Sequence, residues 1–275
     1  MTDSDLDSFL SGRSLYGDDF TDEQIAVWYS DEIDAYADLG ARDRGAGRYM
    51  YHGLNIEHGF RHLPTGMIGS VLGLGSAYVD EFTPILDRLT NITVIEPAAS
   101  LRVDALGSLP VRYVEPVPSG TMSFDDGTFD MAVALGTLHH IANVSHVVGE
   151  IARVVKVGGY VLIREPIISM GDWRTERRGL TRHERGIPLA MLRSLYSTNG
   201  LRIIKETPCM FALSSLYIKY SNRNVYNSRA AVNLDAILCR LFLPNYSYHA
   251  IRSVRKLRPT SVFHVLQRQP GEDLK

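Results

Sequence analysis

Two glycines and a carboxylate in the segment from Ser70 to Pro97 have the spacing of a nucleotide-binding unit. Gly73 and Gly75 interrupt one apolar run, and Glu96 ends a second apolar run 21 positions after Gly75. This order predicts a strand, a glycine turn, a helix and a second strand. Glu96 would stand at the carboxyl end of the second strand, where a carboxylate accepts hydrogen bonds from ribose hydroxyls. The segment therefore predicts a nucleotide site, and the alternative is an ordinary α/β turn that binds no ligand.

The glycine pattern argues against a dinucleotide as the ligand. A dinucleotide fingerprint has a third glycine three positions after Gly75, where a pyrophosphate meets the N-terminus of the helix. That position is Tyr78, which carries a bulky ring. A ligand that has a ribose but no pyrophosphate fits better, and S-adenosylmethionine is such a ligand.

Length and composition are those of an ordinary globular protein. The chain has 275 residues, of which 45% are hydrophobic and 22% charged, and a formal net charge of -2. This charge gives no reason to expect a nucleic acid or an anionic membrane as partner. No apolar run approaches the roughly 20 residues of a membrane span, and the acidic N-terminus lacks the pattern of a signal peptide. Cys209 and Cys239 have no metal-like spacing, so we expect reduced thiols in a cytoplasmic protein.

The elements that would position the nucleotide unit alternate between strand and helix. We expect strands at 68–74, 92–96, 111–114, 129–135, 160–163, 201–206 and 261–267, and helices at 55–62, 79–89, 99–106, 144–155, 189–196 and 234–242. Gly158 and Gly159 would end the helix at 144–155. This alternation predicts an α/β fold, a parallel sheet with helices on both faces. Right-handed crossovers then place the carboxyl ends of the strands, and any ligand, along one edge of the sheet.

The chain divides into four parts on this pattern. An N-terminal helical extension covers 1–65, a nucleotide-binding core 66–208, an insertion 209–258, and a last core strand with the tail 259–275. Within the extension, residues 1–20 are expected to be loose and 40–53 to form a loop. A helix begins at Thr21 with Gln24 as its capping-box partner, and it is either a packed helix or a lid over the ligand site. The insertion could form a homodimer contact, part of a substrate pocket, or buried core.

Three segments resemble one enzyme family. They are LGLGSAY with the later VIEP, FDDGTFDMAVALGTLHHI at 124–141, and EIARVVKVGGYVLIREP at 150–166. With them the chain resembles the class I S-adenosylmethionine-dependent methyltransferases, closest to the group with a ubiquinone-biosynthesis-like core. The resemblance covers about residues 66–166 and the final strand pair. It implies a Rossmann-like fold with a mostly parallel seven-stranded sheet, S-adenosylmethionine as cofactor and S-adenosylhomocysteine as product.

The resemblance also implies the residues that contact the cofactor. They would be Gly73, Leu74, Gly75 and Ser76 at the aminoacyl part, Glu96 at the ribose, Pro97 at the adenine, and Leu135 with Gly136 under the methionine part. One departure concerns the adenine amine, beside which the family usually has an acidic residue just before the FDDG-type segment. The corresponding stretch here is VPSGTM, so backbone groups of Ser119, Gly120 or Thr121 would replace the acid.

Methyl transfer to an alcohol also needs a general base. The candidates are His139 and His140 after the fourth core strand, with Asp172 and His183 in the loop after the fifth. His139 and His140 could instead pack and shape the cofactor pocket, and His183 and Asp172 could be solvated charges. No set of His, Asp and Glu has the spacing of a metal site, so no metal is expected.

Six arginines within 22 positions form a local basic cluster around the same loop. They are Arg164, Arg174, Arg177, Arg178, Arg182 and Arg185. Arginine forks suit phosphate or carboxylate groups, so Arg164, Arg174, Arg182 and Arg185, with Glu184, could bind an anionic acceptor. The alternative is a solvated loop with internal ion pairs.

The acceptor is the least defined part of the prediction. The loop after the fifth strand is similar to that of methyltransferases of bacterial glycans and polysaccharides, which implies O-methylation of a sugar hydroxyl in a glycan or nucleotide-sugar. One alternative is O- or C-methylation of a natural-product or quinone-like ring. Another is a cofactor-binding module without catalysis that serves as a partner protein.

Overall fold

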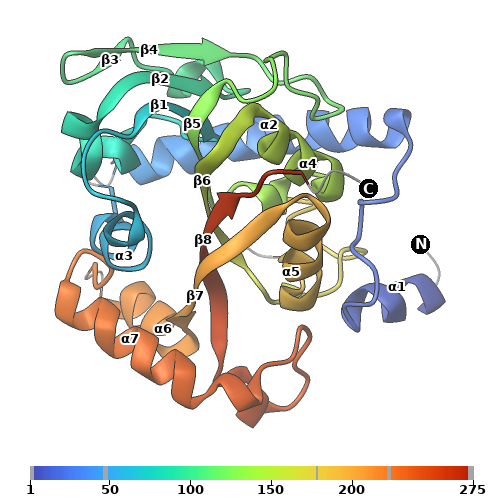
Figure 1. The fold of residues 1–275 in the computed structure, drawn as a ribbon. Helices are drawn as coiled ribbons and strands as arrows, with labels where there is room; N and C mark the ends of the chain where they lie inside the picture. Colours follow the sequence, from blue (N-terminus) through green and yellow to red (C-terminus); the bar gives the residue numbers. More distant parts are fainter. Residues whose placement is uncertain (1–2, 46–48, 178, 222–223, 272–275) are drawn as a thin grey trace.

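The computed structural model describes residues 3–45, 49–177, 179–221 and 224–271, in which the side chains of residues 3, 34–45, 215, 219 and 221 are not described. One sheet of eight strands runs through the molecule in the order β3-β4-β2-β1-β5-β6-β8-β7 (Figure 1). The strands are β1 (Gly69–Leu74), β2 (Leu89–Ile95), β3 (Ala105–Leu106), β4 (Leu109–Val114), β5 (Phe129–Leu135), β6 (Val155–Pro166), β7 (Leu201–Phe211) and β8 (Pro259–Arg268). The five strands β4, β2, β1, β5 and β6 are parallel, whereas β8 is antiparallel to both of its neighbours.

Helices cover both faces of the sheet. The α-helices are α1 (Asp3–Leu10), α2 (Asp22–Gly45), α3 (His52–His58), α4 (Val144–Val154), α5 (Leu189–Thr198), α6 (Ala212–Ser221) and α7 (Arg229–Leu241). Short 3-10 helices are η1 (Phe60–His62), η2 (Asp80–Arg88), η3 (Ala99–Leu101), η4 (Leu138–His140), η5 (Leu243–Asn245) and η6 (Ser253–Lys256). None of the described helices is both long and apolar enough to cross a membrane.

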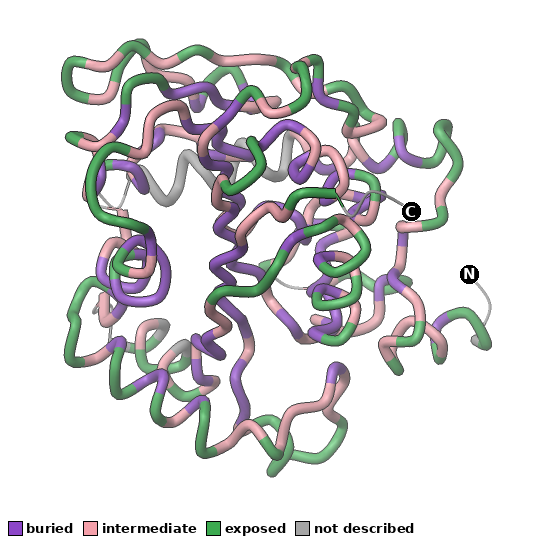
Figure 2. Tube along the Cα trace, in the orientation of Figure 1, coloured by how far each residue is buried: buried purple, intermediate pink, exposed green. Residues whose placement is uncertain are grey.

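The core has two halves because neighbouring residues of a strand point to opposite faces of the sheet. Leu72 and Leu74 of β1 join the cluster that α4 and α5 complete. Val71 points to the opposite face and joins the cluster that contains Leu54 of α3 and Val232 of α7. Figure 2 shows the resulting line of buried residues along the central strands. These buried strands fix the direction of the loops at their carboxyl ends.

The expected α/β architecture is confirmed, with a difference in the strand count. The sheet has eight strands and not seven, because Ala105 and Leu106 form a two-residue antiparallel strand beside β4. A helix was expected at 99–106, and only η3 forms there. The segment expected as a helix at 79–89 is the 3-10 helix η2, and Pro84 in its interior removes one backbone donor.

Of the other local expectations, some are confirmed and some are wrong. The capping box at Thr21 is confirmed: the Thr21 amide donates to Gln24 Oε1 at 3.0 Å and the Gln24 amide donates to Thr21 Oγ1 at 3.4 Å. The loose start over 1–20 is wrong, since α1 lies within it, and the loop at 40–53 is wrong where α2 continues to Gly45 and where α3 begins. Gly158 was expected to end a helix but lies inside β6, where its φ of 82° is accommodated.

Candidate functional site

A solvent-open cleft of about 1000 Å³ lies at the carboxyl ends of the parallel strands. Its walls come from four strand ends, the loop after β4, the start of α4 and one face of α2. Among the residues that line it are Leu74 and Gly75 after β1, Ile95 and Pro97 after β2, Val114 to Pro118 after β4, Gly120 to Phe124 in the next loop, and Thr137 after β5. This is the edge of an open α/β sheet at which ligands bind.

Helix α2 forms one wall of the cleft. Ile25, Trp28, Tyr29, Glu32 and Ile33 line it at helical spacing. Trp28 Nε1 donates to the backbone oxygen of His140 at 2.7 Å, which fastens α2 to the turn after β5. The helix therefore lies where a lid would have to lie. Tyr36, the next residue of the expected stripe, lies outside the described side chains.

The glycine turn after β1 is tightly built. Gly75 has a φ of 58° and its amide donates to the Ile95 backbone oxygen at 2.9 Å, which joins the ends of β1 and β2. A Cβ at Gly73 would overlap the Ser76 side chain, so only glycine fits. Ala77 and Val79 also have positive φ values, 35° and 57°, which are uncommon for residues with a side chain. Backbone strain of this kind gathers at ligand sites.

Glu96 holds this turn in place. Its Oε2 accepts from the Ala77 amide at 3.2 Å and its Oε1 accepts from the Ala98 amide at 2.9 Å. Tyr113 donates to the Ala77 backbone oxygen at 2.6 Å from the other side. Glu96 is 0% exposed, and it does not line the cleft, whereas its neighbours Ile95 and Pro97 do. The carboxylate thus joins the turn after β1 to the segment after β2.

The predicted cofactor residues are distributed around this edge. Leu74, Gly75, Pro97 and Gly120 line the cleft. Gly73 and Ser76 shape the turn beneath it, as described above. The Ser119 backbone oxygen accepts from Asn143 Nδ2 at 2.6 Å, which fixes the loop that carries Gly120 to the start of α4. Leu135, the last residue of β5, and Gly136 do not line the cleft. The Leu135 backbone oxygen accepts from Arg164 Nη2 at 3.1 Å, and the Gly136 amide donates to the Arg164 backbone oxygen at 2.7 Å.

The two histidines of η4 are each held by a buried carboxylate. His139 Nδ1 lies 2.7 Å from Glu165 Oε2, and Glu165 Oε1 accepts from the amides of Thr137 and Leu138 at 2.9 and 2.8 Å. Burial alone would raise the pKa of Glu165, but the charge and hydrogen bond of His139 and these amides lower it below its ordinary value. Glu165 is therefore an ionised acceptor, and His139 donates to it through Nδ1.

His140 is bound in the same manner from α2. Its Nδ1 lies 3.0 Å from Glu32 Oε2, which also accepts from Thr181 Oγ1 at 2.5 Å. Although burial opposes ionisation of Glu32, hydrogen bonds from His140, Thr181 and the His183 amide hold its pKa below the ordinary value. Burial, together with the neighbouring His139, lowers the pKa of His140. His140 lines the cleft, so this ring stands at the reacting end.

His183 and Asp172 have other partners than the predicted ones. His183 Nε2 pairs with Asp31 at 2.8 Å, and its ring stacks on Trp28 with 4.6 Å between centroids. Its sequence neighbour Glu184 instead faces His139, at 3.7 Å from Nε2. Asp172 forms an ion pair with Arg174 at 2.9 Å inside its own loop, and neither residue lines the cleft. Neither His183 nor Asp172 lines the cleft, whereas His140 does, so His140 is the candidate base with access to it.

The predicted arginine cluster does not form one basic surface. Arg185 is 0% exposed and donates to backbone oxygens of Tyr16, Leu138, His139 and Ala142.

The other arginines are engaged as well. Arg164 is buried, with Asn55 Oδ1 at 3.0 Å and the Tyr51 ring at 4.2 Å. Arg182 pairs with Asp31 at 2.9 Å, and Arg178 lies outside the described residues. Among the described residues that line the cleft there is no arginine. The expectation that these arginines together bind an anion is not supported, because their donors serve the fold.

Several residues of the site were missed from the sequence. Glu32 and Thr181 lie about 150 positions apart in the sequence, so no local spacing predicts their contact. Glu165 carried a signal, since a carboxylate at the end of a buried strand needs partners. Glu115, which was also overlooked, lines the cleft with an exposed side chain and pairs with Arg102 at 3.3 Å.

Comparisons with known proteins agree with this geometry. Residues 72–163 match a family model described as "Methyltransferase domain". A curated relative is the sterol 4-C-methyltransferase strm-1 of Caenorhabditis elegans, 26% identical over 109 residues, which are 38% of this chain and 32% of the relative. The chain thus spans about a third of the curated relative that it matches.

Solved structures with the same fold come from distant organisms. A chain in the complex of the Haloferax volcanii Trm112 methyltransferase activator with a methyltransferase matches with a TM-score of 0.58 and 16% identity, over 87% of this chain and 99% of that one. The phosphoethanolamine N-methyltransferase 2 of Haemonchus contortus, solved with phosphomonomethylethanolamine and S-adenosylhomocysteine, matches with a TM-score of 0.53 and 14% identity, over 79% of this chain and 52% of that one. Residues 72–163 therefore match a methyltransferase domain, and the chain has the fold of the class I S-adenosylmethionine-dependent methyltransferases.

Proposed function

We propose that this protein transfers the methyl group of S-adenosylmethionine to a hydroxyl oxygen of a small-molecule or glycan acceptor. The observation that carries the proposal is the cleft at the carboxyl edge of the sheet, which joins a tight glycine turn at one end to the carboxylate-bound His140 at the other. A cofactor in the cleft would present its methyl group toward the histidine end.

The walls of the cleft fit the parts of this cofactor. Ile95, Pro97 and Phe124 provide apolar surface for an adenine ring. The backbone at Gly75 can approach the ligand closely, because no Cβ intervenes. Glu96 is hydrogen-bonded to this turn through the Ala77 amide, and its carboxylate suits the ribose hydroxyls once the residues that cover it move aside.

The reaction needs alignment and removal of one proton. The acceptor oxygen attacks the methyl carbon, the bond from carbon to the sulfonium sulfur breaks, and S-adenosylhomocysteine leaves. The hydroxyl proton passes to a group at the histidine end of the cleft. Because ionised Glu32 accepts from Nδ1 of His140, the lone pair of that ring resides on Nε2, which makes His140 a base of suitable orientation. Glu165 gives His139 the same orientation.

For the acceptor we propose a sugar hydroxyl in a glycan or nucleotide-sugar. The support is the similarity of the loop after β6 to that of bacterial glycan methyltransferases, with a hydroxyl-activating base at the cleft. The hypothesis that the acceptor carries an anionic group is weakened, because Arg164, Arg182 and Arg185 have partners within the protein.

An apolar ring, such as a quinone-like or natural-product acceptor, is the second candidate. The sterol 4-C-methyltransferase relative favours it, because a sterol is an apolar ring system. The largely apolar lining of the cleft does not decide between the two, because the adenine would occupy much of it.

A cofactor-binding partner protein without catalysis is the candidate from another class. The Haloferax volcanii structure is a complex of a methyltransferase with its activator, so a fold of this type is found in a protein assembly. The fixed orientation of His139 and His140 favours catalysis instead, because a module that only binds cofactor does not need two histidines held by buried carboxylates.

The test is a pair of measurements on the purified chain. Calorimetry with S-adenosylmethionine, S-adenosylhomocysteine and NAD should give micromolar binding of the first two and none of the third. Transfer of a labelled methyl group to a panel of glycans, nucleotide-sugars and apolar ring compounds then identifies the acceptor class. Cofactor binding without transfer to any acceptor would favour the partner module, and absence of cofactor binding would reject both.

Glu96→Ala sharpens the cofactor assignment. We expect the variant to bind S-adenosylmethionine at least roughly tenfold more weakly, from lost charged hydrogen bonds worth about 1.5–3 kcal/mol. Glu115→Ala removes the exposed carboxylate of the same cleft and should change the affinity less than Glu96→Ala. If instead Glu115→Ala weakens binding and Glu96→Ala does not, the ribose carboxylate is Glu115.

We also propose a homodimer and a cytoplasmic location. Helices α6 and α7 each expose an apolar stripe, Leu213, Leu216, Tyr217 and Tyr220 on one and Leu234, Ile237 and Leu241 on the other. A second copy could cover these stripes. Both Cys209 and Cys239 are buried free thiols, as is usual for proteins of a reducing compartment.

A further inference from the structure

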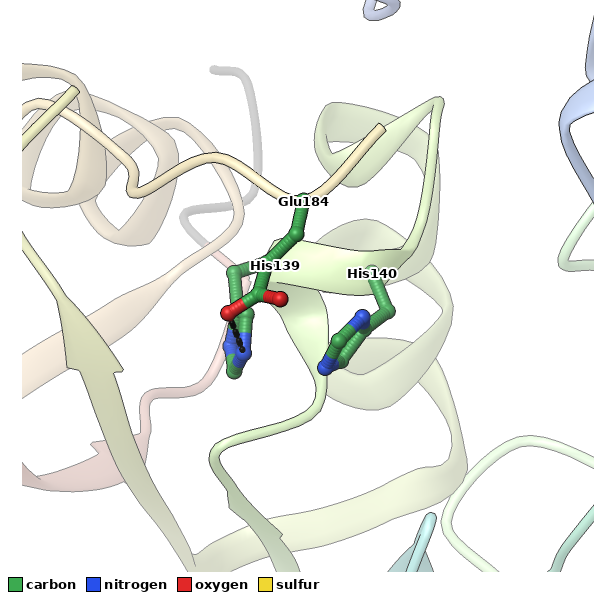
Figure 3. Close-up of side chains that lie close together, drawn as sticks. All are labelled: His139, His140 and Glu184. Carbon is green, nitrogen blue, oxygen red and sulfur yellow. Dashed lines mark ion pairs between the residues drawn. The ribbon is translucent and has the colours of Figure 1, made fainter. Parts of the chain in front are cut away.

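We propose that His139, His140 and Glu184 bind one divalent transition-metal ion of the zinc type. Each of the three side chains offers one ligand atom, and these atoms all lie within 4.8 Å of one another. Figure 3 shows the two imidazoles of η4 beneath the Glu184 carboxylate, which comes from the loop before α5. Two imidazoles and a carboxylate are the donor set of known zinc sites with three protein ligands.

The orientation of His139 is the first support. Its Nδ1 donates to Glu165 at 2.7 Å, and the amides of Thr137 and Leu138 hold the Glu165 carboxylate in place. The lone pair of a neutral His139 is therefore on Nε2, the atom that lies 3.7 Å from Glu184 Oε1. A carboxylate that orients a histidine from behind is the usual second layer of a metal site.

His140 repeats this arrangement from a different element. Its Nδ1 donates to Glu32 at 3.0 Å, and Glu32 is fixed by the Thr181 hydroxyl at 2.5 Å and by the His183 amide at 2.8 Å. An ionised carboxylate with these donors can only accept from the imidazole. Both rings thus present Nε2 as the basic nitrogen, as metal-binding histidines do.

The charge balance of the cluster calls for a cation. Nε2 of a neutral His139 and Oε1 of Glu184 are both acceptors, and two acceptors that face each other at 3.7 Å repel unless a positive charge lies with them. Both residues are 8% exposed, so water screens this repulsion poorly. An extra proton on His139 would relieve this one contact, whereas a metal ion also uses the adjacent His140.

The geometry leaves room for a fourth ligand. Bonds of 2.0–2.1 Å in a tetrahedron place ligand atoms roughly 3.3 Å apart, so the three side chains, whose ligand atoms lie within 4.8 Å of one another, must draw closer when an ion binds. His140 lines the cleft, which gives the open position access to a bound molecule. If the proposed methyl transfer is correct, an acceptor oxygen at this position would bind to the ion and lose its proton to solvent more readily, and the ion would then replace His140 as the group that activates the hydroxyl.

The test measures metal binding without cofactor or acceptor, so it does not depend on the proposed function. The full chain, freed of metal with a chelator, is titrated with Zn²⁺ by calorimetry and with Co²⁺ by visible absorption. We expect one site with a Kd in the micromolar range or tighter, and the intense absorption of a low-coordinate Co²⁺ ion. Glu184→Gln should weaken Zn²⁺ binding at least tenfold and abolish that absorption.

Two controls make the result interpretable. Glu176→Gln places the same change on an exposed residue of the same loop and should bind Zn²⁺ as the unmodified chain does. An unchanged affinity for S-adenosylmethionine in Glu184→Gln would show that the variant is folded. Zn²⁺ binding that is absent, weaker than millimolar, or equal in the two variants would overturn the site.

Discussion

At the scale of single residues, burial shifts the pKa of some side chains away from its ordinary value. Burial of Glu81 raises the pKa of its carboxyl to about 7, although a hydrogen bond from Ser76 opposes the shift. Glu81 begins the turn of η2 that follows the glycine loop, so its charge state acts directly beside the cofactor end of the cleft. A raised pKa means that the folded state holds a proton that the unfolded state releases near pH 4.5.

Glu81→Gln should therefore change the pH dependence of stability. Between about pH 4.5 and pH 7 the wild type loses stability as the pH rises, and above this window the loss is complete. We expect the variant to be more stable than the wild type by about 3 kcal/mol at pH 8 and by less than about 1 kcal/mol at pH 5. Urea unfolding at the two pH values measures this. Glu115→Gln, at an exposed carboxylate, should show no such pH-dependent gain, and an equal effect of Glu81→Gln at both values would contradict the shifted pKa.

At the scale of elements, α2 decides access to the cleft. It supplies five residues of the wall and is fastened to η4 by the bond from Trp28 and to the loop after β4 by a 3.5 Å bond from Tyr29 to the Pro116 backbone oxygen. Glu96 is fully covered in this arrangement. If the proposed contact between the ribose and Glu96 is correct, α2 or the turn after β1 has to open and close again around the cofactor.

Hydrogen exchange followed by mass spectrometry can detect this closure. We expect peptides from residues 22–33 to exchange more slowly after S-adenosylhomocysteine is added, because bound ligand keeps the helix in place. Peptides from α7, which contributes nothing to the cleft wall, serve as the internal control and should not change. Equal protection of both segments, or none in 22–33, would mean that α2 is a fixed wall.

At the scale of the whole molecule, α6 and α7 leave apolar surface uncovered. The buried side of α7, with Val232, Asp235 and Cys239, packs on β7, so the stripe of Ile237 and Leu241 faces away from the core. Exposed stripes on two adjoining elements are uncommon on a monomer and typical of a subunit contact.

The pair of changes Ile237→Glu and Leu241→Glu tests the dimer. Light scattering after size exclusion should give about twice the chain mass of 30.7 kDa for the wild type and the single mass for the variant. Two carboxylates in an apolar contact cost more free energy than such a contact supplies. Met67→Glu, at an exposed apolar residue before β1, is the matched control and should remain dimeric. A wild type of single mass would reject the proposal.

Most of the order of elements and the glycine turn after β1 were readable from the sequence alone. The period of apolar residues and the glycine turn depend on contacts between near neighbours, which a sequence records directly. The capping box at Thr21, helix α4 and the turn around Gly75 are examples. Where a local signal was ambiguous, as at 99–106 or 158–159, packing against neighbouring strands decided, and η3 with β3 and the long β6 formed instead.

Only the tertiary structure decided the histidine end. Glu32, His139, Glu165 and Glu184 come from four separate segments, and no spacing predicts that their polar atoms meet. The arginine cluster shows the converse: six arginines stand close together in the sequence, but burial of Arg164 and Arg185 turns their donors to backbone oxygens, an amide oxygen and an aromatic ring. Nearness along the chain fixes local conformation, whereas the partner of a buried charge depends on which distant segments the fold places around it.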